Sequence, residues 1–527
     1  MFRTLCHPLM VAVLITAVNA TKPVAVDDTA YLTFARHIAG HPLDPYGFEQ
    51  FWTDVPQPAM DVLAPPVLPY WLGLGIAVFG EHELILKLWL FPFAAMLTYS
   101  LRSLGRRFGA NDEIVPLVGL SGLVLPLFGF MLDIPATALG LAALAEFAGG
   151  RHRVVTAGVL AALAMQTKYT AIVLPAVIVW YGLVHGRMKD AALTVLMAVA
   201  LFALWECGLV LKYGESHFLH HAAGESGTDG WLESKTKLAM PMISYLGGLG
   251  IGFVLFAACL HGRRFLAWGL ATFAVLSFVL VAVLPEKSSL AVARVTFLVL
   301  GGLFLFAPEL ALGSKGGSMA TRRFLFGWLI LELIAYFVLT PFPAGRRAIG
   351  FGIAVAFCVS LKKDGVGNAG MSRVWLVGPL LGLLLAGIDS WDARAERDVA
   401  IQSAQYVNGK GGTVWFNGHW GFQYYCELAG MRPVVPDQSK LVPGDWLVFP
   451  TVPDDVGFYR PFHGWAKFVP DPNCLVKETE FVADDWLSGT TIPTLYGGGY
   501  PLLGRSHPRL RVVIYRVTAD YVPVKLP

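Results

Sequence analysis

Long apolar segments separated by short polar turns run along the chain from its N-terminus to about residue 388. A helix needs about 20 apolar residues to cross the hydrocarbon core of a bilayer. Thirteen segments approach that length: roughly 4–20, 84–104, 113–131, 134–149, 154–167, 171–186, 191–211, 239–260, 265–285, 290–312, 324–341, 348–361 and 374–388. The pattern predicts an α-helical polytopic membrane protein with about thirteen transmembrane helices. The first segment also has features of a cleaved signal peptide, but an uncleaved span fits the later segments better.

The segment 65–80 is also apolar, and whether it crosses the membrane decides the side on which every later loop lies. Cytoplasmic loops carry an excess of Lys and Arg. If 65–80 does not cross, these basic clusters all lie inside: Arg102/Arg106/Arg107, Arg151/Arg153, Arg187/Lys189, Arg263/Arg264, Lys315/Arg322/Arg323 and Lys362/Lys363/Arg373. We therefore predict that 65–80 is interfacial or re-entrant, with the N-terminus inside and the C-terminus outside. The pair Arg346/Arg347 is then the one basic cluster outside.

Beyond residue 390 the apolar runs shorten to strand length, and Asp, Pro, Gly and Trp fill the gaps. The elements expected there are a helix at 392–407, a strand at 413–416, a helix at 422–428 and strands at 446–449 and 510–517. The sequence thus predicts a transmembrane domain at 1–389, with juxtamembrane helices in its outer loop 21–83. It also predicts a C-terminal extracytoplasmic α/β domain at 390–527.

The composition agrees with a membrane protein, since 55% of the 527 residues are apolar and 15% are charged. The net charge of +3 is spread over short loops and gives no basis for nucleic-acid binding. The six cysteines show no metal-binding spacing. Cys426 and Cys474 lie in the predicted outer domain, where they can pair if they are close enough.

An acidic pair, Asp27 and Asp28, follows the first apolar segment directly. One interpretation is a cap for a helix at 29–39. The other is a general base held beside a lipid headgroup. Like-charge repulsion and a low-dielectric border both raise a carboxylate pKa toward the range useful for a base, so we expect Asp27 to be the base.

Two further ionisable residues are predicted on the same side of the membrane. Asp133 emerges from the segment 113–131, and Lys168 follows 154–167 in a very short turn. Charges beside apolar spans are costly and indicate function, although Asp133 can equally cap the next helix. A phosphate ligand would explain Lys168 on the outside, and snorkelling to the interface explains it as well.

Three histidines lie in the outer loop 212–238, at positions 217, 220 and 221. Their spacing would place His217, His220 and His221 on one helical face, which suits a metal ion or a proton relay. A divalent metal is therefore a candidate cofactor. Short histidine clusters in loops are also often only solvated.

The order of these features is similar to that of the GT-C glycosyltransferases, in the branch of the protein O-mannosyltransferases and the lipid A aminoarabinose transferase. The matching features are the acidic pair, Pro-Pro and Tyr-Trp-Leu at 65–72, Phe-Gly at 79–80, Arg-Arg-Phe-Gly at 106–109, Leu-Asp-Ile-Pro at 132–135, Thr167-Lys168 and the basic loop at 343–347. The resemblance covers 1–190 in sequence and 191–390 mainly in layout.

The resemblance implies an inverting transfer of a sugar from a polyprenyl-phosphate donor to a hydroxyl of a lipid, glycan or protein on the outer face of a bacterial inner membrane. It assigns Asp27, Asp28 and Asp133 to catalysis. The family's basic residue after the acidic pair is replaced by Ala30, and its acidic-Lys pair before Pro-Pro by Leu63-Ala64. Lys168, Arg346 and Arg347 would then bind the donor phosphate. The alternatives are a transporter or flippase, which would show internal repeats, and an envelope-glycan ligase or polymerase.

Overall fold

The structure is a computed structural model that describes residues 6–52, 55–224, 235–260, 262–312, 317–361, 373–451, 468–484, 487–497, 499–505 and 508–525. The α-helices are α2 (Pro8–Ala20), α3 (Asp28–Gly40), α4 (Val67–Phe79), α5 (Glu83–Trp89), α6 (Phe91–Phe108), α7 (Ile114–Gly119), α8 (Asp133–Gly149), α9 (Val154–Met165), α10 (Leu174–Val184), α11 (Met188–Tyr213), α12 (His217–Gly224), α14 (Ala239–Leu249), α15 (Ile251–Leu260), α16 (Arg264–Val283), α17 (Glu286–Leu312), α18 (Met319–Leu339), α19 (Ile349–Val359), α20 (Val377–Val407), α21 (Trp420–Leu428) and α23 (Ile492–Gly497). The strands are β1 (Glu49–Phe51), β2 (Pro56–Pro58), β3 (Val414–Phe416), β4 (Arg432–Pro433), β5 (Trp446–Thr451), β6 (Leu475–Ala483), β7 (Gly489–Thr490), β8 (Leu503–Gly504) and β9 (Leu510–Val517).

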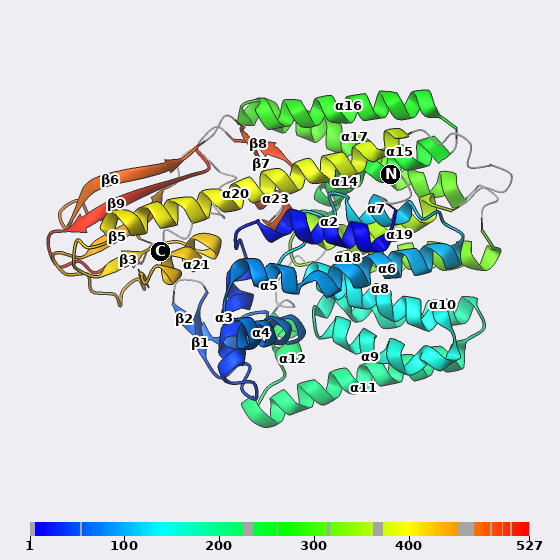
Figure 1. The fold of residues 1–527 in the computed structure, drawn as a ribbon, viewed down its shortest axis with the longest axis horizontal. Helices are drawn as coiled ribbons and strands as arrows, with labels where there is room; N and C mark the ends of the chain where they lie inside the picture. Colours follow the sequence, from blue (N-terminus) through cyan, green and yellow to red (C-terminus); the bar gives the residue numbers. More distant parts are fainter. Residues whose placement is uncertain are drawn as a thin grey trace.

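The long helices run side by side in one bundle (Figure 1). Among the described residues, five helical segments are long and apolar enough to cross a membrane: Glu83–Phe108, Met188–Tyr213, Arg264–Val283, Glu286–Ala307 and Arg373–Val407. The bent pair α14 and α15 makes a sixth if it counts as one span. Large apolar side chains on the outer helices are exposed, for example Leu204 at 70% and Phe265 at 95%, as expected for a surface that faces lipid. The chain is therefore an integral membrane protein, whereas the count of thirteen spans stays a prediction.

Each predicted apolar segment coincides with one helix or two consecutive helices, except 113–131. That prediction of a helical span is wrong, because only Ile114–Gly119 is helical and the chain then runs in turns to Leu132. Gly119 is the last residue of α7, and Pro126 disfavours a helix in the turns that follow. The non-helical segment 120–132 is wholly buried between other helices, where Asn19 Nδ2 donates to Leu125 O at 2.9 Å.

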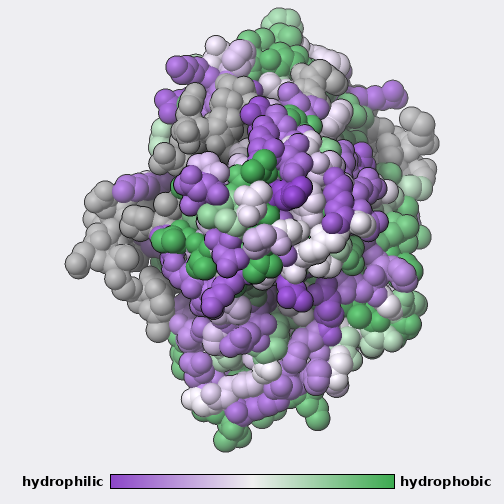
Figure 2. Space-filling model, turned by 90° about the vertical axis from the view of Figure 1, so that its left-hand side faces the viewer, coloured by the Kyte–Doolittle hydropathy of each residue, from purple (hydrophilic) through white to green (hydrophobic). Residues whose placement is uncertain are grey.

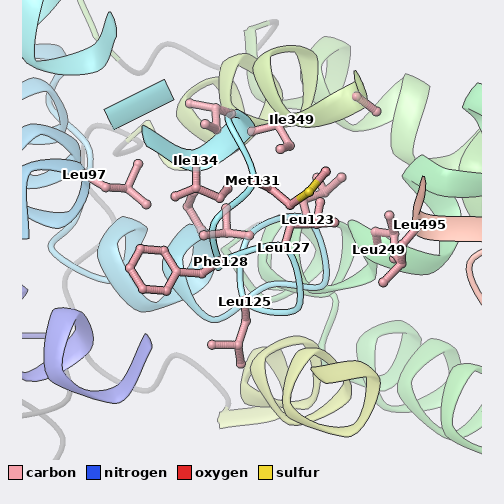
Figure 3. Close-up of a cluster of buried hydrophobic side chains, with 14 of the residues drawn as sticks. Leu97, Leu123, Leu125, Leu127, Phe128, Met131, Ile134, Leu249, Ile349 and Leu495 are labelled. Carbon is pink, nitrogen blue, oxygen red and sulfur yellow. The ribbon is translucent and has the colours of Figure 1, made fainter. Parts of the chain in front are cut away.

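Side chains of this buried segment form the centre of the core (Figure 3). Leu123, Leu127 and Phe128 pack there with residues from surrounding helices, including Leu97 of α6 and Ile349 of α19. Backbone away from regular structure is tolerated at membrane depth only where protein covers it. The segment therefore still connects the two ends of the bundle, but inside the protein.

The segment 65–80 forms α4, which ends at Gly80 with φ 75°. Figure 1 shows α4 nearly end-on and α3 running across the direction of the long helices. Thirteen helical residues rise only about 20 Å, less than the 30 Å of the hydrocarbon core. The helix is therefore shorter than a full span, and the interfacial or re-entrant position of 65–80 stays a prediction.

The C-terminal region carries a five-stranded sheet in the order β4-β3-β5-β9-β6. β3 pairs in parallel with β4 and β5, and β9 runs antiparallel to β5 and β6. The strands β3, β5 and β9 and the helix α21 lie where the sequence predicted them, whereas β4, β6, β7 and β8 were not predicted. The edge strand β6 was missed because most of its side chains are exposed. The predicted division at 389/390 falls inside the unbroken helix α20, so the two-domain division stays a prediction.

The sheet, the hairpin of β1 and β2, and α21 all gather at one end of the bundle (Figure 1). Figure 2 looks onto this end, which is largely hydrophilic, with hydrophobic residues at its rim and in small groups within the face. The opposite end holds the C-terminus of α6, where Arg102 and Arg106 pair with Asp112. We call the end with the sheet the sheet end.

Candidate active site

The acidic pair lies between α2 and α3, in a short segment held in an unusual conformation. Val26 has φ 49°, in the left-handed region that is costly for a β-branched residue. Trp420, at the start of α21, also has a positive φ of 58°, and its carbonyl accepts a hydrogen bond from Thr29 Oγ1 at 2.7 Å. Such strain persists only where the surroundings fix it and is common at functional sites. The C-terminal region thus packs directly against the segment that presents Asp27.

Asp27 forms an ion pair with an arginine far away in the sequence. Arg346 Nη1 donates to Asp27 Oδ2 at 2.8 Å. The Arg346 side chain is 11% exposed and that of Asp27 is 20% exposed. Arg346 belongs to the 3₁₀ turn Gly345–Ala348 that precedes α19. The carboxylate of Asp27, the predicted base, therefore neutralises part of the charge of the Arg346/Arg347 pair.

Asp28 points to a different cation, Lys87 of α5. Lys87 Nζ lies 3.4 Å from Asp28 Oδ2, both side chains are buried, and the ammonium lies 4.2 Å from the centroid of the Phe130 ring. The expectation that Asp28 affects Asp27 only through like-charge repulsion is therefore incomplete, because each carboxylate pairs with a cation of its own. Sequence reasoning missed Lys87, although a lone lysine in the apolar run Leu84 to Trp89 was a usable signal.

Asp133, the first residue of α8, forms an ion pair with Lys168, which follows α9. The Asp133 side chain is 3% exposed and that of Lys168 is 21% exposed. Arg346 and Arg347 also interact electrostatically with Asp133. The structure thus brings together the candidate residues Asp27, Asp28, Asp133, Lys168, Arg346 and Arg347, which come from four separate parts of the chain.

A cavity opens beside this group of charges. Its empty volume is about 950 Å³, part of which is open to the surroundings. Five ionisable residues line it: Asp133, Lys168, Glu332, Arg346 and Arg347. The rest of its lining comes mainly from apolar residues of α8, α10, α18 and α19: Ala136, Gly140, Leu141, Leu144, Leu174, Val177, Trp328, Ala335, Leu339, Ile349, Gly350 and Ile353. The cavity can therefore hold an anionic group against the cations and an apolar chain along the helices.

The three candidate metal ligands do not converge on one point. His217 Nε2 donates to Val62 O at 3.1 Å, and its Nδ1 accepts from the Tyr169 hydroxyl at 2.6 Å. His221 Nε2 lies 3.1 Å from Met60 O. Among the residues that the structure describes, no group of three or more His, Cys, Asp or Glu can hold a metal. The imidazoles instead attach α12 to the segment 59–62.

The electrostatic state of these imidazoles fits a structural role. Burial lowers the pKa of His217 from its ordinary value of 6.5 to about 3, and the neighbouring His221 acts in the same direction. His217 is therefore neutral at physiological pH. His220 is more exposed and lies 3.1 Å from Asp61 and 3.0 Å from Glu215. The six cysteines, Cys426 and Cys474 included, are free thiols.

No protein-family model matches the chain, and the search of curated proteins finds no match. Among solved structures, it is similar to the oligosaccharyltransferase of Archaeoglobus fulgidus tethered with an acceptor peptide, with 15% identity, a TM-score of 0.46, and coverage of 81% of this chain and 63% of that one. It is also similar to ArnT from Cupriavidus metallidurans bound to undecaprenyl phosphate, with 16% identity, a TM-score of 0.41, and coverage of 96% and 97%. A third similar structure is the arabinofuranosyltransferase AftD from mycobacteria, with 15% identity, a TM-score of 0.38, and coverage of 98% and 40%.

These three structures are of GT-C glycosyltransferases. The chain spans less than two thirds of the length of the oligosaccharyltransferase. Every TM-score is below 0.5, so the likeness alone assigns no activity to this chain.

Proposed function

We propose that this chain is a membrane glycosyltransferase that moves a sugar from a polyprenyl-phosphate donor to an acceptor hydroxyl. The observation that carries the proposal is the two-part cavity. Its wall holds three cations and the acidic residues Asp133 and Glu332, and apolar residues of four helices lie along its length. A polyprenyl phosphate has the same two parts, a charged phosphate and a long apolar chain. A site for a soluble nucleotide sugar would have no use for the apolar part.

The cations have distinct uses toward the phosphate. Arg346 and Arg347 present planar guanidinium groups, which bind phosphate oxygens in pairs, and Lys168 adds a compact positive charge. All three line the cavity. When the bond to the sugar breaks, negative charge grows on the phosphate, and these groups stabilise it.

Asp27 is the proposed general base. It removes the proton of the acceptor hydroxyl while the acceptor oxygen forms a bond to the anomeric carbon of the sugar. The bond from that carbon to the phosphate oxygen breaks, and its electron pair leaves with the polyprenyl phosphate. Because the displacement is single, the anomeric configuration inverts. A phosphate bound to Arg346 competes with Asp27 for the guanidinium, which lies only 2.8 Å from the carboxylate.

The proposed reaction takes place on the extracytoplasmic face of a bacterial inner membrane. The support is the placement of basic residues, since the ends of α6 and α8 away from the site carry the Arg102/Arg106 and Arg151/Arg153 clusters. A cysteine-accessibility label in the C-terminal sheet tests this orientation. A label that reacts only from the cytoplasm would reverse the assignment of the faces.

The direct test uses purified protein with polyprenyl-phosphate sugars that carry a radioactive sugar. A transferase of this kind releases free polyprenyl phosphate and moves the label to an acceptor lipid, glycan or protein. A transporter or flippase moves the lipid across a vesicle membrane and leaves it intact. A ligase or polymerase that uses diphosphate-linked donors releases polyprenyl diphosphate instead. Intact donor after incubation with a range of acceptors would contradict the proposal.

A further inference from the structure

A short part of the C-terminal region folds back onto the outer ends of the bundle helices. This part, residues 488–505, holds β7, α23 and β8. Ser488 Oγ donates to Ala282 O at the end of α16 at 2.6 Å, and Gly504 N donates to Ser289 Oγ of α17 at 2.6 Å. Because both of its ends are attached to the bundle, α23 between them has a fixed position.

Asp392 of α20 holds the start of α23. Its Oδ2 accepts hydrogen bonds from Thr491 N at 2.9 Å and from Thr490 Oγ1 at 3.0 Å, and Arg509 pairs with its other oxygen. One turn further on, Leu495 packs beside Leu249 of α14 (Figure 3). α23 therefore enters the bundle next to the turn Gly345–Ala348, which carries Arg346.

The next residue, Tyr496, lies between two cations and is only 5% exposed. Its hydroxyl accepts a hydrogen bond from Lys22 Nζ at 2.9 Å and donates to Asp389 Oδ2 at 3.3 Å. Its ring centroid lies 5.8 Å from Cζ of Arg346, within the range of a cation–π contact. The phenol is thus fixed at its hydroxyl, and its ring is a buried neighbour of the Arg346 guanidinium.

We infer that Tyr496 is a positioning residue that holds the Arg346 guanidinium in place to bind the donor phosphate. Arg346 has a long side chain, and keeping it in one orientation costs entropy unless packing restrains it. Asp27 restrains one edge of the guanidinium at 2.8 Å, and the aromatic ring supplies a second contact that does not compete for its hydrogen bonds. The inference rests on the proposed function, because it names the C-terminal region as part of the same donor site.

The test compares Tyr496→Phe and Tyr496→Leu in the full chain in detergent, with binding of undecaprenyl phosphate as the readout. Phenylalanine keeps the ring and loses the hydroxyl, whereas leucine keeps an apolar side chain and loses the ring. We expect Tyr496→Phe to bind within about threefold of the wild type. We expect Tyr496→Leu to bind about five- to thirtyfold more weakly, the range for losing a desolvated cation–π contact. In transfer assays, Tyr496→Leu should raise KM for the donor more than it lowers kcat.

Tyr521→Leu is the matched control, because Tyr521 is also a buried C-terminal tyrosine but packs with Leu441 and Phe468 in a separate core cluster. It should lose thermal stability without losing affinity for undecaprenyl phosphate. Equal affinity of folded Tyr496→Leu and wild type would overturn the inference, and so would a loss in Tyr496→Phe as large as that in Tyr496→Leu. If the wild type itself does not bind undecaprenyl phosphate, the proposed function fails instead.

Discussion

Two polar clusters near the sheet end differ in what their side chains contact. In the first, Asp27 and Asp133 pair with Arg346 and Lys168 beside a cavity. In the second, His217 and His221 contact main-chain carbonyls. Both stood out in the sequence as candidates for chemistry. Access to a cavity, rather than the presence of ionisable groups, separates the candidate active site from the structural cluster.

The two clusters are nevertheless connected through neighbouring residues. Tyr169, whose hydroxyl donates to His217 Nδ1, directly follows Lys168 in the chain. The imidazole is thus joined to the turn that carries one of the proposed phosphate ligands. Variants in the first cluster should mainly change catalysis, and variants in the second should mainly change stability.

The largest effect is expected for Asp27→Asn. The amide keeps the shape of the side chain but cannot accept a proton, so we expect transfer per folded protein to fall by about 100-fold or more. The variant should still fold and insert, with some loss of thermal stability because Arg346 loses its paired carboxylate. The measurement is the initial rate of transfer, normalised to monodisperse protein in detergent.

Asp28→Asn is the matched control for that variant. It leaves Lys87 buried without its carboxylate, so it should lower thermal stability more than it lowers the rate of the folded protein. If Asp27→Asn stays within a few-fold of the wild type while Asp28→Asn or Asp133→Asn is inactive, the base is misassigned.

A smaller effect on the same site is expected for Lys168→Ala. Loss of a charged hydrogen bond to the phosphate should raise KM for the donor about tenfold. Lys168→Arg keeps the charge but not the compact shape, so it should recover part of this loss. An unchanged KM in Lys168→Ala would leave Arg346 and Arg347 as the phosphate ligands.

The second cluster should respond to pH through stability. The folded state holds His217 neutral, with its pKa lowered to about 3, whereas the unfolded chain takes up the proton near 6.5. The contribution of neutral His217 to the free energy of unfolding is therefore present above pH 6.5 and is lost as the pH falls below 6.5. Between pH 7 and 5 this one group should lower the free energy of unfolding by about 2 kcal/mol. Thermal unfolding of the wild type and of His217→Gln at several pH values measures this pH dependence. Equal slopes of stability against pH in the two proteins would refute the prediction.

The smallest effect is expected for His220→Asn. The imidazole of His220 is about one third exposed and pairs with Asp61 and Glu215 at the surface. Such pairs contribute about 0–1 kcal/mol. Transfer should stay within about twofold of the wild type, with or without a chelator. A metal-dependent loss of transfer that is specific to His220→Asn would instead support a metal site at the histidines.

The apolar runs predicted most helices because each buried or lipid-facing helix needs a continuous apolar stretch. They failed at 113–131, since composition alone does not distinguish a helix in lipid from a coil covered by protein. For the site, the sequence identified each charged residue except Lys87 and Glu332 by its position beside an apolar segment. It did not predict the partners. Arg346 meets Asp27 across 319 positions of the chain, and only tertiary packing sets that contact.

The buried, non-helical segment 120–132 also affects how the protein is made. A nascent chain enters the bilayer most readily as helices that satisfy their own backbone hydrogen bonds. This segment forms only some of its backbone hydrogen bonds within itself. It also uses the Asn19 amide and the Lys22 ammonium, which donate to Leu125 O and Pro126 O. It can reach its final place only when α2 and the later helices are already beside it. Biogenesis must therefore delay this crossing until its neighbours have been synthesised, so truncation after α8 should leave the segment outside the bilayer core.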